Sequence, residues 1–266
     1  MPKSLFTAAR ECLLADSLDD KVALTHAYAE RWREGDLSNS PTTDAPITQP
    51  GRPALPKLIS PRDLPRRKLS DPKGHACLIH AIAHIEFNAI DLAWDAVHRF
   101  QAMPRDYYSD WIRVADEEAR HFTLLSNHLL SMDYCYGDFP AHNGLWDMAQ
   151  QTADDVMVRM ALVPRVLEAR GLDVTPGMMK RLEAIGDHRG AEILNVIWQD
   201  EVGHVEIGTR WFHFACEQRG LNADKTFAAL IAQYIPEKVR GPFDHNTRKK
   251  AGFSEWELDF LETYEG

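Results

Sequence analysis

A repeated Glu-x-x-His motif constrains this chain more than any other feature. Glu118 and His121 form the first copy, and Glu201 and His204 form the second. On an α-helix, residues three apart lie on one face, so each copy can present a carboxylate and an imidazole to one metal ion. One such copy is expected by chance in a chain of this composition. Two copies in similar surroundings predict a pair of metal-binding helices.

Two further glutamates extend the motif into a pattern that repeats. Glu86 lies 32 residues before Glu118. Glu168 lies 33 residues before Glu201. All four glutamates interrupt apolar stripes with helical spacing, which are formed by Ile79, Ile82, Ala83, Ala89, Ile90, Ala93, Trp111, Val114, Ala115, Phe122, Leu125, Met157, Ala161, Pro164, Leu172, Leu194, Ile197, Trp198, Val205 and Gly208. Buried carboxylates persist by pairing with cations or by binding metal. The alternative is four independent salt bridges or surface glutamates.

Six side chains are therefore the predicted metal ligands. They are Glu86, Glu118, His121, Glu168, Glu201 and His204. Four carboxylates and two imidazoles form an oxygen-rich set that suits iron or manganese better than metals that prefer thiolates. Six ligands shared by two ions leave positions open for water, dioxygen or substrate, and Glu118 and Glu201 are the predicted bridges. The predicted cofactor is two iron ions, or manganese, or a mixed manganese–iron pair.

Acidic residues directly precede two of the predicted ligands. Metal-binding histidines usually donate their second ring nitrogen to a carboxylate or carbonyl. We predict that Asp200 orients His121 and that Glu117 orients His204; the alternative is that both acids lie on helix surfaces. Arg120 and Arg210 are candidates for ion pairs with these two acids.

Helix signals cover most of the chain and predict an all-α fold without competing strands. Four long helices are expected at about 73–102, 104–132, 146–170 and 188–219. Asp71 can cap the first helix with Pro72 in its first turn, and Gly171 is expected to end the third. A shorter helix is expected after Gly171, with Thr175 as its cap and Pro176 at its first position. The predicted architecture is a four-helix bundle with helical extensions at both ends.

Three parts are expected along the chain. They are N-terminal helices with a proline-rich arm at 1–72, the bundle at 73–219 and a C-terminal helical extension at 220–266. The extensions are expected to hold short helices at 4–15, 19–34, 223–233 and 254–264. The region 35–72 contains eight of the fifteen prolines, which excludes regular helix. We expect an ordered arm on the bundle rather than a linker, with apolar anchors at Leu55, Leu58, Ile59 and Leu64.

Composition indicates a globular protein in a reducing compartment. The chain has 266 residues, of which 44% are hydrophobic and 26% are charged. No apolar run approaches the length of a membrane span, and the N-terminus lacks the features of a signal peptide. The four cysteines are scattered and predict free thiols in the cytoplasm. The formal charge of −10 argues against broad binding of nucleic acid.

Other polar residues favour structural roles. His80 and His84 share a helix face that continues through Asn88, Asp91 and Asp95, away from Glu86, which predicts a solvated or interhelical polar stripe rather than a metal site. The tyrosine pairs Tyr107–Tyr108 and Tyr134/Tyr136 could include a redox tyrosine, although packing is the simpler reading. The basic cluster Arg62, Arg66, Arg67 and Lys68 predicts a solvated patch, with contact to an anionic partner as the alternative.

The ligand pattern resembles that of the ferritin-like superfamily over residues 73–219. Within it, the chain resembles an uncharacterised bacterial family catalogued as a domain of unknown function. Glu168-Ala169-Arg170 is similar to the third-helix segment of di-iron tRNA hydroxylases. The segments 118–121 and 200–204 resemble the Asp-Glu-x-Arg-His segments of di-iron monooxygenases, with Glu117 in place of Asp and Gly203 in place of Arg.

The resemblance implies oxygen chemistry but not a substrate, because one fold supports many activities. The leading hypothesis is an oxidoreductase whose di-iron centre activates dioxygen or peroxide toward a small or nucleotide-like substrate, with a possible electron-donor protein as partner. An alternative class is a metal storage, sensor or structural protein. A third hypothesis is a hydroxylase that modifies tRNA or nucleotides. No membrane partner is expected.

Overall fold

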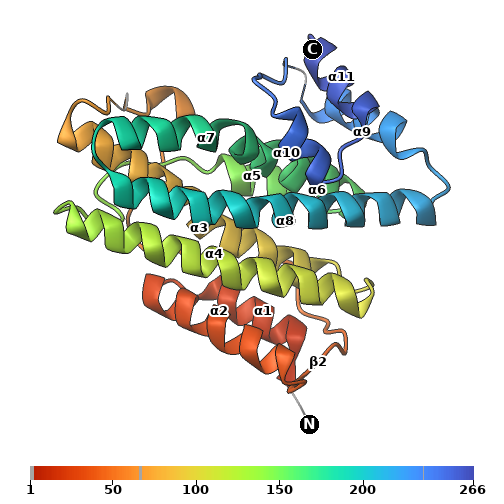
Figure 1. Ribbon diagram of the computed structural model, residues 1–266. Coiled ribbons are helices and arrows are strands. Elements are labelled where there is room, and N and C mark those ends of the chain that lie inside the picture. The colour runs from red at the N-terminus through yellow and green to blue at the C-terminus, as the bar shows by residue number, and fades with distance from the viewer. Residues whose placement is uncertain (1–2, 66–67, 236) are drawn as a thin grey trace. The chain divides into compact units, whose positions relative to one another are not determined.

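The computed structural model describes residues 3–65, 68–235 and 237–266, and shows an all-α protein with long packed helices (Figure 1). This confirms the predicted fold class. The chain forms two compact units, Met1–Asp147 and Met148–Gly266. The division falls within the short helix α5 (Gly144–Gln151). The predicted three-part division at residues 72 and 219 stays a prediction, as does the four-helix bundle.

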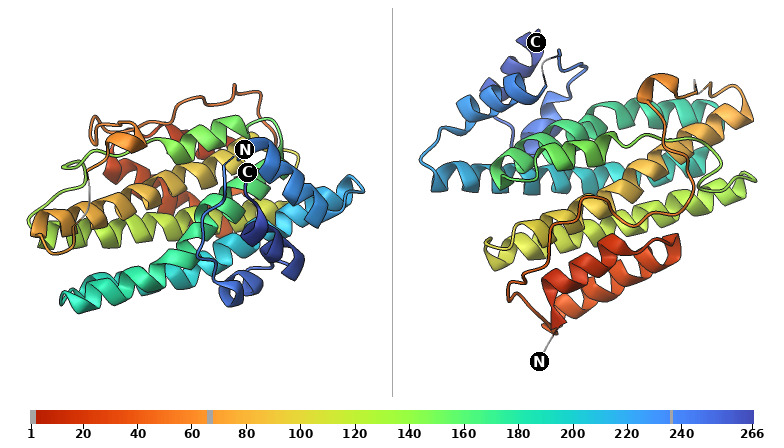
Figure 2. Two further views of the ribbon diagram at one scale, coloured as in Figure 1. Left: turned by 90° about the horizontal axis from the view of Figure 1, so that it is seen from above. Right: turned by 180° about the vertical axis from the view of Figure 1, so that it is seen from behind.

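Unit 1 is built on two long helices that pack along each other, α3 (Pro72–Arg99) and α4 (Arg105–Ser131). The N-terminal helices α1 (Leu5–Leu14) and α2 (Leu18–Arg33) pack on α3 and α4, respectively (Figure 2). Side-chain oxygens accept hydrogen bonds from the first free backbone amides of α1, α2 and α3, which fixes where these helices begin. All four helices lie within two residues of their predicted starts.

One strand pair was not predicted. β1 (Lys3–Ser4) and β2 (Leu37–Ser38) form a parallel ladder of two residues each. Gly35 stands just before β2 with a φ of 82°, a conformation that glycine adopts without steric cost. This turn ends α2 and brings the arm back beside the start of α1.

The polar stripe of α3 is buried and lies between structural elements. The Nδ1 atom of His84 is 2.8 Å from the Tyr136 hydroxyl, and Asn88 accepts a hydrogen bond from Arg52 at 2.8 Å. Asp91 forms a fully buried ion pair with Lys21 of α2 at 2.5 Å. The stripe therefore holds the arm, the 134–143 loop and α2 against α3. The stripe was predicted to be either solvated or interhelical, and the interhelical alternative is correct.

Over its described residues the proline-rich arm packs on the rest of unit 1, but its predicted anchors are partly wrong. Leu55 and Leu58 are exposed, at 57% and 40% of their surface. Ile47 and Pro56 are buried in their place. Polar contacts also fix the arm, because side chains of α3, of α5 and of Gln101 just after α3 hydrogen-bond to its backbone. One example is the Trp146 indole, which donates to the Thr48 carbonyl at 3.0 Å. Hydrophobicity alone could not predict which of these arm residues are buried and which are exposed.

Unit 2 is organised around α8 (His188–Gln218), against which α6 (Val156–Leu162), a π-helix (Val163–Glu168) and α7 (Ala169–Ala184) pack. Three helices complete the unit: α9 (Ala223–Tyr234), α10 (His245–Lys250) and α11 (Glu255–Thr263). The capping box of Ser254 and Glu257 forms as the sequence indicates. The short helix α10 was not predicted.

The predicted third helix begins near its expected start but is wrong in its continuity and at its end. Helix is interrupted after α5, at residues 152–155, so 146–170 is not one element. Gly171 does not end a helix, and Pro176 lies inside α7 rather than at a helix start. A proline within a helix frees the carbonyl four residues earlier, here that of Leu172. The indole of Trp198 donates to this carbonyl at 3.2 Å. This hydrogen bond from Trp198 of α8 therefore permits α7 to continue through Gly171 and Pro176, where local sequence signals predict an interruption.

Helix α3 matches a membrane span in length and composition, which a search for long apolar runs misses. Its most apolar window has a mean hydropathy of 1.3, and 89% of that window is buried inside the structure. A single such helix is weak support for a membrane segment, because core helices meet the same criterion.

Candidate metal centre

Three predicted ligands meet in unit 1. Glu86 comes from α3, and Glu118 and His121 come from one face of α4. One ligand atom from each residue lies within 4.8 Å of the other two. The Nδ1 atom of His121 is 3.2 Å from a carboxylate oxygen of Glu86 and 3.5 Å from one of Glu118. Regular helix geometry and the close packing of α3 on α4 are sufficient to produce this cluster.

The chemistry of this cluster fits a transition metal. All three side chains are at most 3% exposed. Two carboxylates close together in a buried site repel each other, and a divalent cation relieves that repulsion while accepting both oxygens. Because Nδ1 is the atom that faces the carboxylates, Nδ1 would be the ligand atom of His121. Its Nε2 would then be available to a supporting hydrogen-bond acceptor.

The second motif lies in unit 2, on α8. The Nδ1 atom of His204 is 3.7 Å from a carboxylate oxygen of Glu201. The His204 side chain is 1% exposed and that of Glu201 is 12% exposed. Both histidines thus turn the same nitrogen toward the glutamate of their own motif. Within unit 2, the described residues contain no three-residue cluster of the kind found in unit 1.

Glu168 is the last residue of the π-helix Val163–Glu168. The wider turn of a π-helix changes the direction of the side chains that follow it, and such turns occur often at functional sites. The prediction that Glu168 joins the other five ligands, and that all six converge on one centre, is tested by neither unit alone and stays a prediction.

A buried arginine within the π-helix, Arg165, anchors this segment to α11. Arg165 donates to both carboxylate oxygens of Glu257, each at 2.7 Å, and both side chains are fully buried. Its guanidinium lies 4.3–4.8 Å from the ring centroids of Phe212, Phe227 and Phe253. Such a desolvated cation held by rings and a bidentate carboxylate has little freedom to move.

A glycine allows the π-helix to approach α8. A Cβ atom at Gly208 would lie 2.3 Å from Cγ of Pro164, so only glycine fits under this proline. The sequence alone does not indicate that Arg165 binds Glu257 or that Gly208 lies under Pro164. Glu257 carried a local signal as a helix-capping residue, but its partner lies 92 residues away. No local pattern links residues so distant.

The predicted supporting residues lie beside the ligands. Glu117 is half-buried and lines a pocket together with Arg120. Arg210 is 3.5 Å from Glu206 on its own helix, and its predicted ion pair with Asp200 or Glu117 stays a prediction. The pairings of Asp200 with His121 and of Glu117 with His204 stay predictions.

The tyrosine pairs have packing roles where the structure describes them. Tyr107 and Tyr108 are buried and meet edge to face, and Tyr134 packs on Phe139. Tyr136 differs because its ring contacts Phe87 and Phe122, which directly follow two predicted ligands. Its pKa is raised by burial, so the hydroxyl stays protonated. Within the predicted basic cluster, Arg62 and Lys68 are exposed, whereas Arg66 and Arg67 lie outside the described residues.

Comparison with known proteins shows the family of this chain. The chain belongs to the family described as "Protein of unknown function (DUF455)", whose model matches residues 14–259. It is 46% identical over 216 residues to an uncharacterized protein of Haemophilus influenzae, a match that covers 79% of this chain and 75% of the relative. No solved structure matches significantly. The predicted membership of an uncharacterised family is confirmed.

Proposed function

We propose that this chain is a di-iron carboxylate protein of ferritin-like, four-helix-bundle architecture. We further propose that it is a cytoplasmic oxidoreductase that activates dioxygen or peroxide toward a substrate. The observation that carries the proposal is the buried meeting of Glu86, Glu118 and His121. The second motif supports it, because Glu201 and His204 repeat the same arrangement on α8. Glu168 would complete the set of six.

The residues of the chain would divide the work as follows. The six predicted ligands would hold the ions, and Glu118 and Glu201 are the two that are predicted to serve both. When bound, a pair of iron ions supplies redox chemistry and Lewis acidity. The apolar side chains around the ligands, such as Phe87 and Phe122, exclude water from the site. Asp200 and Glu117 would hold the ligand imidazoles in one tautomer.

Metal analysis tests the first part of this proposal. Protein purified aerobically or reconstituted with ferrous iron should contain up to two transition metal ions per chain. Glu118→Ala and Glu201→Ala should reduce that number sharply, because a bridging carboxylate serves both ions. Asp110→Ala, on α4 but outside the ligand set, is the control. Anomalous scattering at the iron and manganese edges identifies the native metal. A chain that binds no metal after reconstitution would exclude the proposal.

One observation favours a second candidate function. The five pockets described in unit 1 are lined by residues other than Glu86, Glu118 and His121. A centre without a path for substrate would suit a storage, sensor or structural metal protein, whereas an enzyme needs such a path. Oxidation of the ferrous protein by dioxygen, followed optically, separates the two functions. Oxidation faster in the presence of an added substrate supports the enzyme, and loading beyond two ions per chain supports storage.

A further inference from the structure

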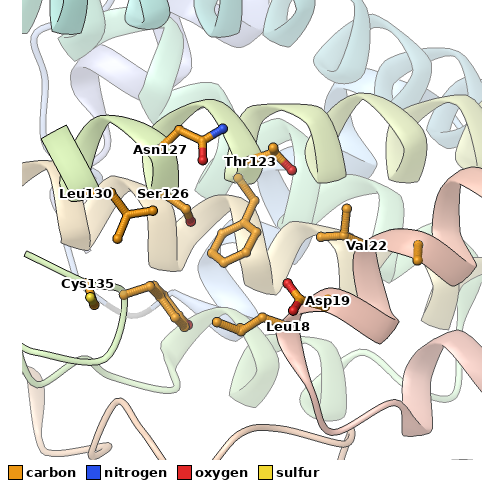
Figure 3. Close-up of a pocket in the computed structure, with 11 residues that line it drawn as sticks. Leu18, Asp19, Val22, Thr123, Ser126, Asn127, Leu130 and Cys135 are labelled. Carbon is orange, nitrogen blue, oxygen red and sulfur yellow. The ribbon is translucent and has the colours of Figure 1, made fainter.

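A pocket of about 410 Å³ lies in unit 1 between the first turns of α2 and the second half of α4 (Figure 3). Leu18, Asp19 and Val22 line it from α2. Phe122, Ser126 and Leu130 line it from α4. This volume lies within the usual range for small-molecule sites, about 300–1,000 Å³. None of the six is among the predicted ligands, so the pocket is distinct from the candidate metal centre.

Most of the lining is apolar. The Phe122 ring forms a buried wall and packs on Phe87, with 5.1 Å between ring centroids. Leu130, near the end of α4, is 57% exposed. An apolar group in the pocket would remove this leucine and the half-buried Leu18 and Val22 from water. Burial of apolar surface would therefore favour an apolar ligand.

The polar residues of the lining include Asp19, Ser126, Thr123 and Asn127. Asp19 is the one charged residue of the lining. Its carboxylate forms no hydrogen bond or ion pair with the residues that the structure describes. The Ser126 hydroxyl is buried and likewise has no hydrogen-bond partner among them. A buried hydroxyl without a partner is costly, so a ligand that supplies one is favoured. No lysine or arginine lines the pocket, which disfavours an anion.

We propose that this pocket binds a small amphipathic amine. The ammonium group would lie at the Asp19 carboxylate, and the apolar body would lie against Phe122, Leu18 and Val22. Ser126 would hydrogen-bond to a polar atom of the ligand. The formal charge of the chain, −10, favours the approach of a cation to the protein. The proposal does not depend on the metal centre.

Three probes of equal chain length test the chemical class: hexylamine, hexan-1-ol and hexanoate. Each is titrated into the full-length protein without added metal and followed by NMR. Hexylamine should bind about two- to fivefold more tightly than hexan-1-ol, the increment of an exposed ion pair. Hexanoate should bind the most weakly. Hexanoate binding as tightly as hexylamine would overturn the proposal.

A matched pair of variants tests the role of the carboxylate. Asp19→Asn should remove the preference for hexylamine over hexan-1-ol. Asp20→Asn, one residue further on and outside the pocket, should keep it. Both acids lie in the first turn of α2, and the Ser17 hydroxyl still accepts from the Asp20 amide in both variants. The fold should therefore survive. An unchanged preference in Asp19→Asn would contradict the assignment.

A cysteine at the rim tests the location. Cys135 lines the pocket and is exposed, whereas Cys12, Cys77 and Cys216 are buried. Iodoacetamide should thus modify Cys135 first, and saturating hexylamine should slow this modification several-fold. Val22→Trp, which fills the pocket, should abolish that protection, and its fold is checked by circular dichroism. Modification at the same rate with and without hexylamine would place the ligand elsewhere and reject the site.

Discussion

The two Glu-x-x-His helices share a spacing but differ in what surrounds them. In unit 1, the motif of α4 meets Glu86 of α3, and both helices are regular over their whole lengths. In unit 2, the motif of α8 packs beside a helix that changes from α to π geometry and back, and Glu168 lies at that change. The first half of the predicted site therefore follows from regular geometry, whereas the second half depends on an irregular turn.

This difference shows where the second half is vulnerable. The π-helix is held by Arg165, whose partner Glu257 belongs to the C-terminal helix α11. It is also held by Pro164, which fits over Gly208 of α8. Contacts remote in sequence thus support the segment that ends at Glu168. We expect changes in these contacts to affect unit 2 and leave the cluster of unit 1 intact.

The largest effect is expected from Glu257→Ala. The change leaves the buried Arg165 cation without its carboxylate, which costs about 3–5 kcal/mol of unfolding free energy. Chemical denaturation measures the loss. Hydrogen exchange should show faster exchange in the π-helix and α11, with little change in α3 and α4. The control is Glu255→Ala in the same helix, which removes only an exposed contact with Lys249. Equal losses of protection in both units would contradict the comparison.

A pair of glycines on α8 sharpens the comparison. Gly208→Ala places a Cβ against Pro164, and overpacking of this kind costs up to about 3 kcal/mol. Gly203→Ala meets no atom within 4 Å. It should stabilise the helix by about 0.5–1 kcal/mol, because alanine is the better helix former. Thermal unfolding of both variants checks the signs. A neutral Gly208→Ala would mean that the π-helix is not fixed by this contact.

Asp200→Asn tests the supporting carboxylate of the second motif. The amide is nearly isosteric, so the fold and most metal binding should persist. Metal affinity or the rate of ferrous oxidation should fall about ten- to a hundredfold, equal to about 1.4–2.7 kcal/mol. Metal titration measures the change, and Asp110→Asn is the control. Identical behaviour of the two variants would reject the role of Asp200 while leaving the metal site itself in place.

The smallest expected effect is a loss of stability at low pH, which arises from His84 in the polar stripe of unit 1. Burial lowers the pKa of His84 to about 4, so the folded state binds the proton more weakly than the unfolded state, whose pKa is near 6.5. Stability is therefore complete above pH 6.5 and falls as the pH decreases toward 4. Between pH 7 and pH 5 the loss from this residue should be about 1–2 kcal/mol.

Denaturation of the wild type and of His84→Gln at both pH values isolates this contribution. The wild type should lose more stability on acidification than the variant. Hydrogen exchange should show the loss first in the 134–143 loop, because His84 contacts Tyr136 and the His142 carbonyl there. An equal loss of stability in both proteins would mean that His84 does not titrate in this range.

The local sequence was sufficient to predict those helices in which the capping residues and the apolar periodicity indicate the same bounds. The bounds of α3, α4 and α8 and the capping box of α11 could be predicted, because caps and helical periodicity act over a few residues. The same short range places Glu118 beside His121 and Glu201 beside His204. The meeting of Glu86 with Glu118 and His121 was also foreseeable, since two long helices joined by a short loop pack along each other.

Tertiary structure decided the places where local signals conflict. Pro176 and Gly171 indicate a helix end, yet α7 continues because Trp198 satisfies the Leu172 carbonyl. The π turn at 163–168 exists where Arg165 reaches a carboxylate 92 residues away. Hydrogen bonds and ion pairs between distant segments are as strong as local ones but leave no periodic pattern. The sequence by itself therefore determined which residues could bind metal, whereas the fold decided how the segment that carries Glu168 is shaped.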